Sequence, residues 1–166
     1  MGVRKKNREA ISVSTIAPHR EDDSLIKEKR LLRVLEAANI IPWEADPQTW
    51  RFTYVGSQAE RMLGYPLDQW YEKDFWTSTI FPEDRERAIN FCETSSKTLS
   101  NFEVQYRMVK SDGNVIWLRD IVNVEIEDGV PQVLRGYMID ITANKVLEQT
   151  LRDDRDQLAE SLEKQG

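Results

Sequence analysis

The spacing of hydrophobic residues changes at Ile40. From Leu25 to Ala38 apolar residues recur three or four positions apart, which predicts an amphipathic helix with Ser24 as its N-cap. After Ile40 the pattern is typical of strands, and the turn signal Asp46-Pro47 divides it into strands over residues 40–46 and 50–55. The residues before Ser24 have no clear period, so we expect residues 1–23 to form a mobile leader.

The rest of the chain predicts short helices, three strands and a last helix. Helices are expected over residues 58–63, 67–71, 74–78 and 82–95, with Gly64 ending the first in a left-handed conformation. Strands follow over residues 101–109, 115–127 and 131–141, each pair separated by turn residues. A helix then runs from Ala143 to the C-terminus. Together these elements predict an α+β fold with five strands.

Turn chemistry sets the expected strand register. If Asp128-Gly129 forms a two-residue hairpin loop, then Glu127 faces Val130 and Leu118 faces Ile139. A three-residue loop containing a left-handed residue would precede the middle strand and place Phe102, Val104 and Tyr106 beside Val124, Val122 and Asp120.

This register predicts what each sheet face carries. Asp120 and Arg135 would point into the core. The opposite face would carry six side chains: Trp117, Arg119, Ile121, Leu134, Met138 and Asp140. Because so apolar a face is rarely left bare, we expect the helix over residues 24–38, from this chain or from a dimer partner, to cover it.

Composition excludes several classes of protein. The 166 residues carry a net charge of −6, which argues against binding to nucleic-acid backbones. No apolar run approaches the ~20 residues of a membrane-spanning helix, and we find no signal peptide. One cysteine, Cys92, and one histidine, His19, leave no cluster for a metal site or an internal disulfide. We therefore expect a soluble, cytoplasmic domain without a metal.

Four segments resemble a PAS domain when they are taken together. They are Gly56-Ser57-Gln58-Ala59-Glu60-Arg61-Met62-Leu63-Gly64-Tyr65, Phe81-Pro82-Glu83-Asp84-Arg85 with Phe81 in place of the family's His, Glu103-Val104-Gln105-Tyr106-Arg107 followed by Asp112-Gly113 and Trp117, and Gly136-Tyr137-Met138-Ile139-Asp140-Ile141-Thr142. The last ends in the Asp-Ile-Thr signature that joins a PAS core to its output helix.

The resemblance implies a fold, a domain organisation and a role. We expect a five-stranded antiparallel sheet with helices on one face over residues 40–142, an N-terminal helix over 24–39 and a C-terminal signalling helix over 143–166. The module would sense a signal, dimerise and regulate a C-terminal output domain, such as a histidine kinase, diguanylate cyclase or phosphodiesterase. Because the chain ends inside a charged amphipathic helix, we expect it to belong to a longer protein. A ligand-free dimerisation and relay domain is the alternative.

The signature also indicates a relay site, formed by Asp140, Ile141, Thr142, Trp117 and Arg119. In the expected register Asp140 opposes Trp117 and lies diagonal to Arg119, within reach of a cross-strand charge pair. Such a pair at the junction could hold the output helix at one angle. An ordinary surface ion pair of ~0–1 kcal/mol is the alternative.

A ligand pocket would lie between the sheet and the helices. Its candidate residues are Trp43, Phe52, Met62, Phe75, Trp76, Ile89, Tyr106, Asp120 and Arg135. The same residues could equally form a packed core without a ligand. Leucines expected to form dimer contacts are Leu25, Leu32 and Leu35 in the first helix and Leu147, Leu151 and Leu158 in the last.

The cofactor of the module is unknown, and two familiar ones do not fit. The flavin-binding branch of the family has its reactive cysteine in Asn-Cys-Arg-Phe-Leu, whereas this chain has Asn90-Phe91-Cys92-Glu93-Thr94. Haem-binding members use a histidine from the helical region, whereas His19 precedes the domain.

Overall fold

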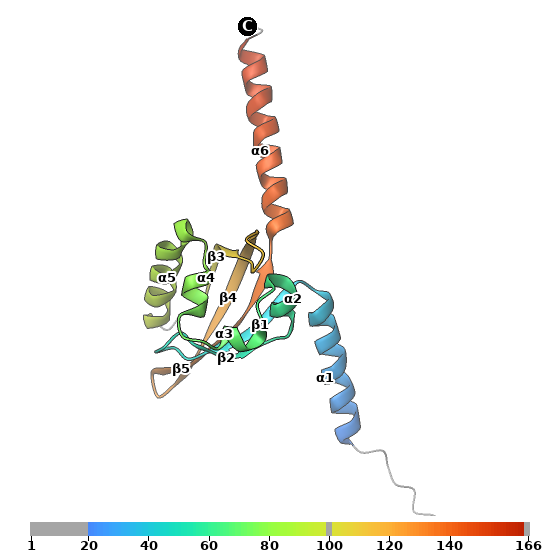
Figure 1. Ribbon diagram of the computed structural model, residues 1–166, viewed down its shortest axis with the longest axis vertical. Coiled ribbons are helices and arrows are strands. Elements are labelled where there is room, and N and C mark those ends of the chain that lie inside the picture. The colour runs from blue at the N-terminus through green and yellow to red at the C-terminus, as the bar shows by residue number, and fades with distance from the viewer. Residues whose placement is uncertain (1–19, 99–100, 165–166) are drawn as a thin grey trace, which may run out of the picture. The chain divides into compact units, whose positions relative to one another are not determined.

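The computed structural model describes residues 20–98 and 101–164 (Figure 1). The contacts divide the chain into residues 1–33 and 34–166. Helix α1 spans Arg20–Ala37, so Ser24 lies inside the helix and the N-cap expected there is wrong. Most of the predicted leader, with His19, lies outside the described residues.

Five strands form one antiparallel sheet in the order β2-β1-β5-β4-β3, which confirms the predicted fold class. The strands are β1 (Ile40–Ala45), β2 (Phe52–Val55), β3 (Phe102–Val109), β4 (Val115–Glu127) and β5 (Val130–Asp140). The last strand therefore pairs with the first in the middle of the sheet, and the two chain ends of the sheet meet there.

Four helices, α2 to α5, lie over one face of the sheet (Figure 1). They are α2 (Gln58–Leu63), α3 (Leu67–Trp70), α4 (Phe75–Thr79) and α5 (Pro82–Lys97), and α6 (Thr142–Glu163) follows the sheet. Gly64 ends α2 with a φ of 81°, as predicted, and Pro82 occupies the first turn of α5.

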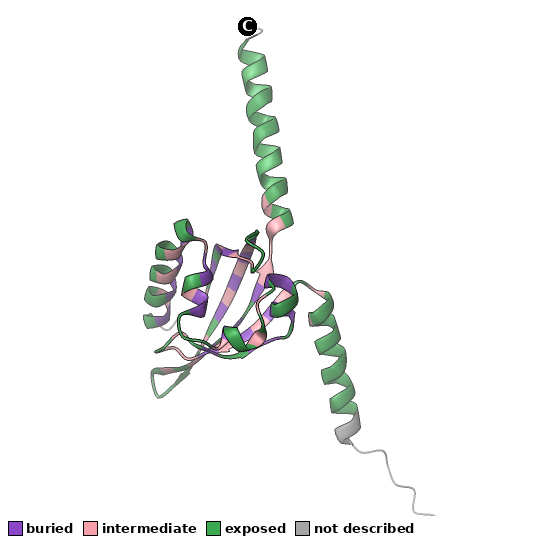
Figure 2. Cartoon of the chain, viewed as in Figure 1, coloured by how far each residue is buried: buried purple, intermediate pink, exposed green. Residues whose placement is uncertain are grey.

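The core lies between these helices and the sheet, where Figure 2 shows buried residues alternating along the strands. In β4 the buried positions are Ile116, Leu118, Asp120 and Val122. In β5 they are Leu134, Gly136 and Met138. The predicted placement of Leu134 and Met138 on the opposite face is therefore wrong.

A β-bulge in β5 explains the error. Asp128 and Gly129 form the expected two-residue turn, with φ of 51° and 76°, and Glu127 does face Val130. Between Ile126↔Pro131 and Glu125↔Val133 the register shifts, which leaves Gln132 as an extra residue. Because Pro131 lacks the N–H that a ladder needs, a bulge beside it is the usual accommodation.

The bulge moves each later residue of β5 to the other face. Leu118 faces Asp140 instead of Ile139, and Arg135 lies on the face away from the helices. The turn before β4 follows the prediction more closely, because Ser111, Asp112 and a left-handed Gly113 form a three-residue loop. There Phe102 faces Val122 instead of Val124, a two-residue shift that keeps the side chain on the predicted face.

Candidate functional site

A buried carboxylate accepts hydrogen bonds from two aromatic side chains in the core. The Trp43 Nε1–H donates to Asp120 Oδ1 over 2.9 Å, and the Tyr106 hydroxyl donates to Oδ2 over 2.8 Å. The Trp76 Nε1–H donates to the Tyr106 oxygen over 3.0 Å. Three strands and a short helix thus converge on one acid, which is only 3 % exposed.

Burial dominates the acidity of this carboxylate. It raises the pKa of Asp120 to about 7 from 3.8, and the hydrogen bonds from Tyr106 and Trp43 offset only part of that effect. Among the described residues, no ion pair includes Asp120. The group therefore changes its charge near neutral pH.

A cavity of about 20 Å³ lies beside the carboxylate, which is room for about one water molecule. Its lining comprises Trp43, Ala45, Trp50, Phe52, Trp76, Cys92, Asp120, Val122 and Met138. Four predicted pocket residues are among them, and Met62, Phe75, Ile89 and Tyr106 pack in the surrounding core. A ligand larger than water would require this core to open.

Arg135 does not belong to the predicted pocket. Its guanidinium forms ion pairs with Glu44 at 2.8 Å and Glu125 at 3.0 Å, away from Asp120, because of the bulge at Gln132. The prediction of an inward Arg135 diagonal to Asp120 is wrong.

Cys92 and Trp50 line the cavity and were not predicted to do so. Burial raises the pKa of the Cys92 thiol, so the thiol is protonated near neutral pH and is a poor nucleophile. The sequence signal available for Trp50 was an aromatic residue at the start of the strand expected after the Asp46-Pro47 turn.

A second charged cluster ties the start of α5 to β3. The backbone N–H, Nε and Nη2 of Arg107 all donate to the carboxylate of Asp84, at 2.8 to 2.9 Å. The hydrogen bond from Arg107 lowers the pKa of Asp84 despite its burial. The Arg107 guanidinium also lies 4.2 Å from the ring centroid of Phe81 and 5.3 Å from that of Trp117. The pairing of Asp84 with Arg107 was not predicted from the sequence.

The Asp-Ile-Thr signature binds the beginning of α6 to β4. The Ile141 N–H donates to the Trp117 carbonyl over 2.9 Å, and the Trp117 N–H donates to Thr142 Oγ1 over 3.0 Å. Asp140 Oδ1 accepts from the Thr142 N–H over 2.9 Å, and Lys145 Nζ lies 5.0 Å from the Trp117 ring centroid. Four of the predicted relay residues therefore lie together.

Arg119 does not join them. Its Nε donates to Glu103 Oε2 over 2.8 Å, and Asp140 faces Leu118, so the predicted Asp140–Arg119 charge pair and the Asp140–Trp117 pairing are wrong. The shift of one residue at the bulge is again the reason.

The same junction also contacts the residues that lead into the sheet. The Asp140 N–H donates to the Asn39 carbonyl over 3.0 Å. Arg61 of α2 donates to the Glu36 carbonyl over 2.8 Å and to Asn39 Oδ1 over 3.2 Å. The residue before β1 and the last residue of β5 are thus joined by a hydrogen bond.

The leucines expected at a dimer interface are largely exposed. Leu147, Leu151 and Leu158 of α6 are each about 60 % exposed, and Leu25 and Leu32 of α1 are exposed as well, whereas Leu35 is half-buried. After the register correction, the sheet face away from the helices carries Ile40, Trp117, Ile121, Tyr137 and Ile139. Whether α1 covers this face stays a prediction.

Within residues 20–98 and 101–164, no helix has both the length and the apolar character needed to cross a membrane.

Comparisons with known proteins identify the family of this chain. The sequence profile of the PAS fold family matches residues 52–138. The sensor protein FixL of Bradyrhizobium diazoefficiens is 28 % identical over 119 residues, which cover 71 % of this chain and 23 % of FixL. A blue-light-activated histidine kinase of Brucella anthropi is 26 % identical over 144 residues, covering 87 % of this chain and 27 % of the kinase. The chain therefore spans about a quarter of the length of these relatives.

Two solved structures are also similar. The N-terminal domain of a diguanylate cyclase with a PAS/PAC sensor from Marinobacter aquaeolei is 37 % identical, with a TM-score of 0.61, covering 64 % of this chain and 98 % of that one. A sensory box histidine kinase/response regulator from Burkholderia thailandensis has a TM-score of 0.65 at 23 % identity, covering 79 % of this chain and 98 % of that one. This last likeness concerns the fold alone.

Proposed function

Because the chain belongs to the PAS family, we propose that it is a non-catalytic sensory module that regulates a C-terminal output domain through α6. Its relatives include a blue-light-activated histidine kinase and a diguanylate cyclase with a PAS/PAC sensor, so a signalling enzyme of one of these kinds is the proposed output. The cytoplasmic location expected from the sequence is part of the proposal.

The observation that carries the proposal is the junction at Trp117. Trp117 bonds through its backbone to both Ile141 and Thr142, and its ring contacts Lys145 in the first turns of α6. The Arg107 guanidinium also lies over the Trp117 ring, and it is hydrogen-bonded to the carboxylate of Asp84 in α5. A displacement of α5 would therefore reach α6 through two adjacent strands.

The size of the internal cavity favours the second candidate, a ligand-free relay. A cavity of about 20 Å³ holds about one water, so rearrangement of a homodimer would be the signal in that case. The exposed leucines of α1 and α6 support a homodimer because such stripes usually pack against a partner helix. Native mass spectrometry of the purified chain separates the two candidates: a retained small molecule supports ligand sensing, and a clean dimer supports the relay.

The substitution Asp140→Ala tests the regulatory role in the protein that joins this chain to its output domain. It removes the acceptor for the Thr142 N–H, and we expect the ratio of stimulated to basal output to change several-fold. Glu127→Ala, at the exposed far end of β4, is the matched control. Equal basal output and equal response in the wild-type protein and in Asp140→Ala would contradict the proposed regulatory role of this junction.

A further inference from the structure

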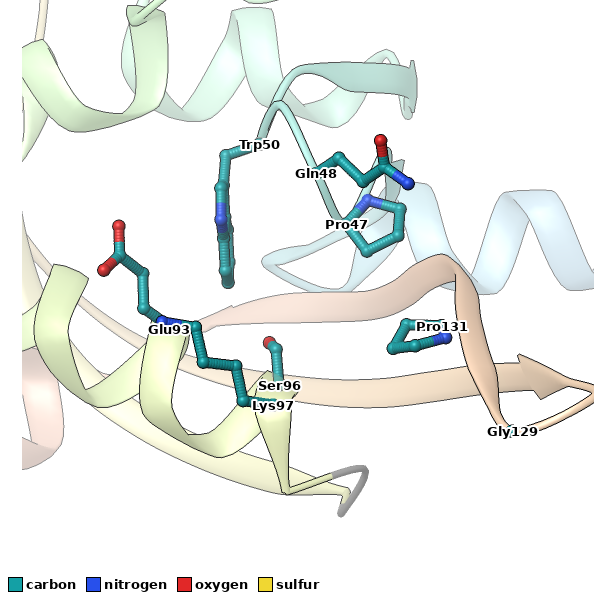
Figure 3. A pocket seen from close by; sticks show the side chains of 8 residues that line it. All are labelled: Pro47, Gln48, Trp50, Glu93, Ser96, Lys97, Gly129 and Pro131. Carbon is teal, nitrogen blue, oxygen red and sulfur yellow. The ribbon is translucent and has the colours of Figure 1, made fainter.

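A groove of about 610 Å³ lies beside the β4–β5 hairpin, and Figure 3 shows the side chains that line it. It is bordered by the β1–β2 connection, the last turns of α5 and the β4–β5 hairpin. Its lining comprises Pro47, Gln48, Trp50, Glu93, Ser96, Lys97, Gly129 and Pro131. This volume is typical of sites for small molecules, and only Trp50 also lines the internal cavity.

The β1–β2 connection holds Trp50 firmly in this groove. Asp46 Oδ1 accepts from the N–H groups of Gln48 and Thr49, both over 2.8 Å, and the Trp50 N–H donates to the Asp46 carbonyl over 2.9 Å. Trp50 has a φ of 58°, which is uncommon for a bulky residue and strains the backbone. The surrounding bonds therefore keep the backbone of Trp50 in a conformation that it would not otherwise favour.

The indole of Trp50 forms one wall of the groove. It stacks on Trp76 with a centroid distance of 5.7 Å and an interplanar angle of 15°. Figure 3 shows the indole edge-on, with Pro47 and Pro131 across the groove from it. A planar molecule between these walls would extend the Trp76–Trp50 stack by one ring, because aromatic faces prefer offset stacking.

The floor of the groove has a polar group without a partner. Ser96 is 6 % exposed, and its Oγ has no hydrogen-bond partner among the described residues. A buried polar group without a partner is unfavourable, and a ligand that bonds to it after moving a groove side chain aside would remove that cost. Glu93 and Lys97 lie one helical turn apart and contribute one charge of each sign, so the lining has no net charge. Gln48 adds an amide that both donates and accepts.

We propose that this groove binds a small, neutral, planar aromatic molecule with a carboxamide-like group. The ring stacks on Trp50 opposite the two prolines, and the polar group bonds to Ser96. Binding does not depend on the proposed relay, since it is a property of the chain alone. It would nevertheless reach the core, because Trp50 stacks on Trp76, whose indole nitrogen bonds to Tyr106.

Nicotinamide is a suitable probe, and cyclohexanecarboxamide is its control because it has the same amide on a ring that is not flat. The indole N–H signals of the five tryptophans report binding by NMR as each compound is titrated into the full chain. Titration to ~20 mM exceeds the ~1 mM dissociation constant expected of so small a ligand. We expect saturable shifts of the Trp50 signal, and at least tenfold weaker binding of cyclohexanecarboxamide.

Three variants complete the test. Trp50→Leu should weaken nicotinamide binding at least tenfold, and Ser96→Ala, which removes only a hydroxyl, about threefold or more. Tyr54→Leu, which removes an exposed aromatic ring outside the groove, should leave binding unchanged. The proposal is wrong if nicotinamide gives no saturable shift, if the two amides bind equally, or if neither groove variant weakens binding. Ser96→Ala keeps the test decisive if Trp50→Leu fails to fold.

Discussion

The indole N–H of Trp43 in β1 and the carboxylate of Asp120 in β4 form a hydrogen bond of 2.9 Å inside the core. Because burial raises the pKa of Asp120 to about 7, the folded chain holds a proton that the unfolded chain releases above about pH 4. The free energy of unfolding therefore falls as the pH rises from about 4 to about 7, and this group contributes no further change above that window.

The substitution Asp120→Asn should remove this dependence. Between about pH 5 and about pH 8 the wild-type chain should lose up to about 3 kcal/mol more stability than the variant. Urea unfolding at both pH values measures the difference. Asp154→Asn, in the exposed part of α6, should keep the wild-type slope. Parallel pH profiles for wild type and Asp120→Asn would contradict the assigned pKa.

The ion pair between Asp84 and Arg107 should contribute far more to the free energy of unfolding than the ion pair between Glu83 and Arg107. Asp84→Asn leaves a half-buried guanidinium without its main partner, and we expect a loss of about 2–4 kcal/mol in urea unfolding. Glu83→Gln removes a carboxylate that is 76 % exposed on the same Arg107, and should cost less than about 0.5 kcal/mol. Equal losses of stability for the two variants would show that the burial of Asp84 does not strengthen its ion pair with Arg107.

The hydroxyl of Thr142 should protect one particular amide. Thr142→Ala removes the acceptor for the Trp117 N–H, so hydrogen exchange at that amide should accelerate about tenfold, equivalent to ~1.4 kcal/mol. Thr142→Ser keeps the oxygen and should retain most of the protection. Exchange at Trp117 is read by NMR, with the Tyr106 amide in β3 as the internal reference. The same exchange rate in the Ala and Ser variants would mean that Thr142 Oγ1 does not hold the junction.

A side chain at position 136 should destabilise the fold. A Cβ there would overlap the Ile121 carbonyl oxygen and lie 3.1 Å from Trp43, in the middle of the sheet. Gly136→Ala should therefore cost about 2–3 kcal/mol in thermal or urea unfolding. Gly113→Ala is a useful comparison, because its φ is 86° but the space around it is open, so only backbone strain of about 1 kcal/mol is expected. A smaller loss at Gly136 than at Gly113 would contradict the close packing of β4 on β5.

The leucines of α6 should matter for association and little for folding. Leu147→Asp combined with Leu151→Asp places charges on an exposed apolar stripe, so sedimentation velocity should show a monomer for this variant and the proposed homodimer for the wild type. Asn144→Asp adds one charge to the same helix and should leave the dimer intact. A wild-type chain that is monomeric at all concentrations measured would rule out the proposed homodimer.

Local patterns predicted the elements well, and one irregularity explains most errors. The α2 helix, its left-handed Gly64 and the Asp128-Gly129 turn were all evident from residue types whose backbone preferences are strong. The extra residue at Gln132 was not, because a bulge depends on how the ladder accommodates Pro131. Since side chains alternate, this one residue reversed the predicted faces of Leu134 and Arg135 together with the rest of β5.

The candidate sites were predicted well where they depend on local sequence. Asp120 was correctly predicted to point inward because the bulge in β5 does not change which residues of β4 face the core. The residues of the Asp-Ile-Thr signature were found because the motif is local. The groove at Trp50 was missed because it combines residues of three separate segments, none of which carries a motif of its own.

The hydrogen bond from the Asp140 N–H to the Asn39 carbonyl has a topological consequence. It places the first and last residues of the strand-and-helix core next to each other, so the polypeptide leaves the core where it arrived. The core is thus a segment whose entry and exit points lie side by side. A segment of this kind can be inserted into a chain or removed from it while the polypeptide enters and leaves at the same place.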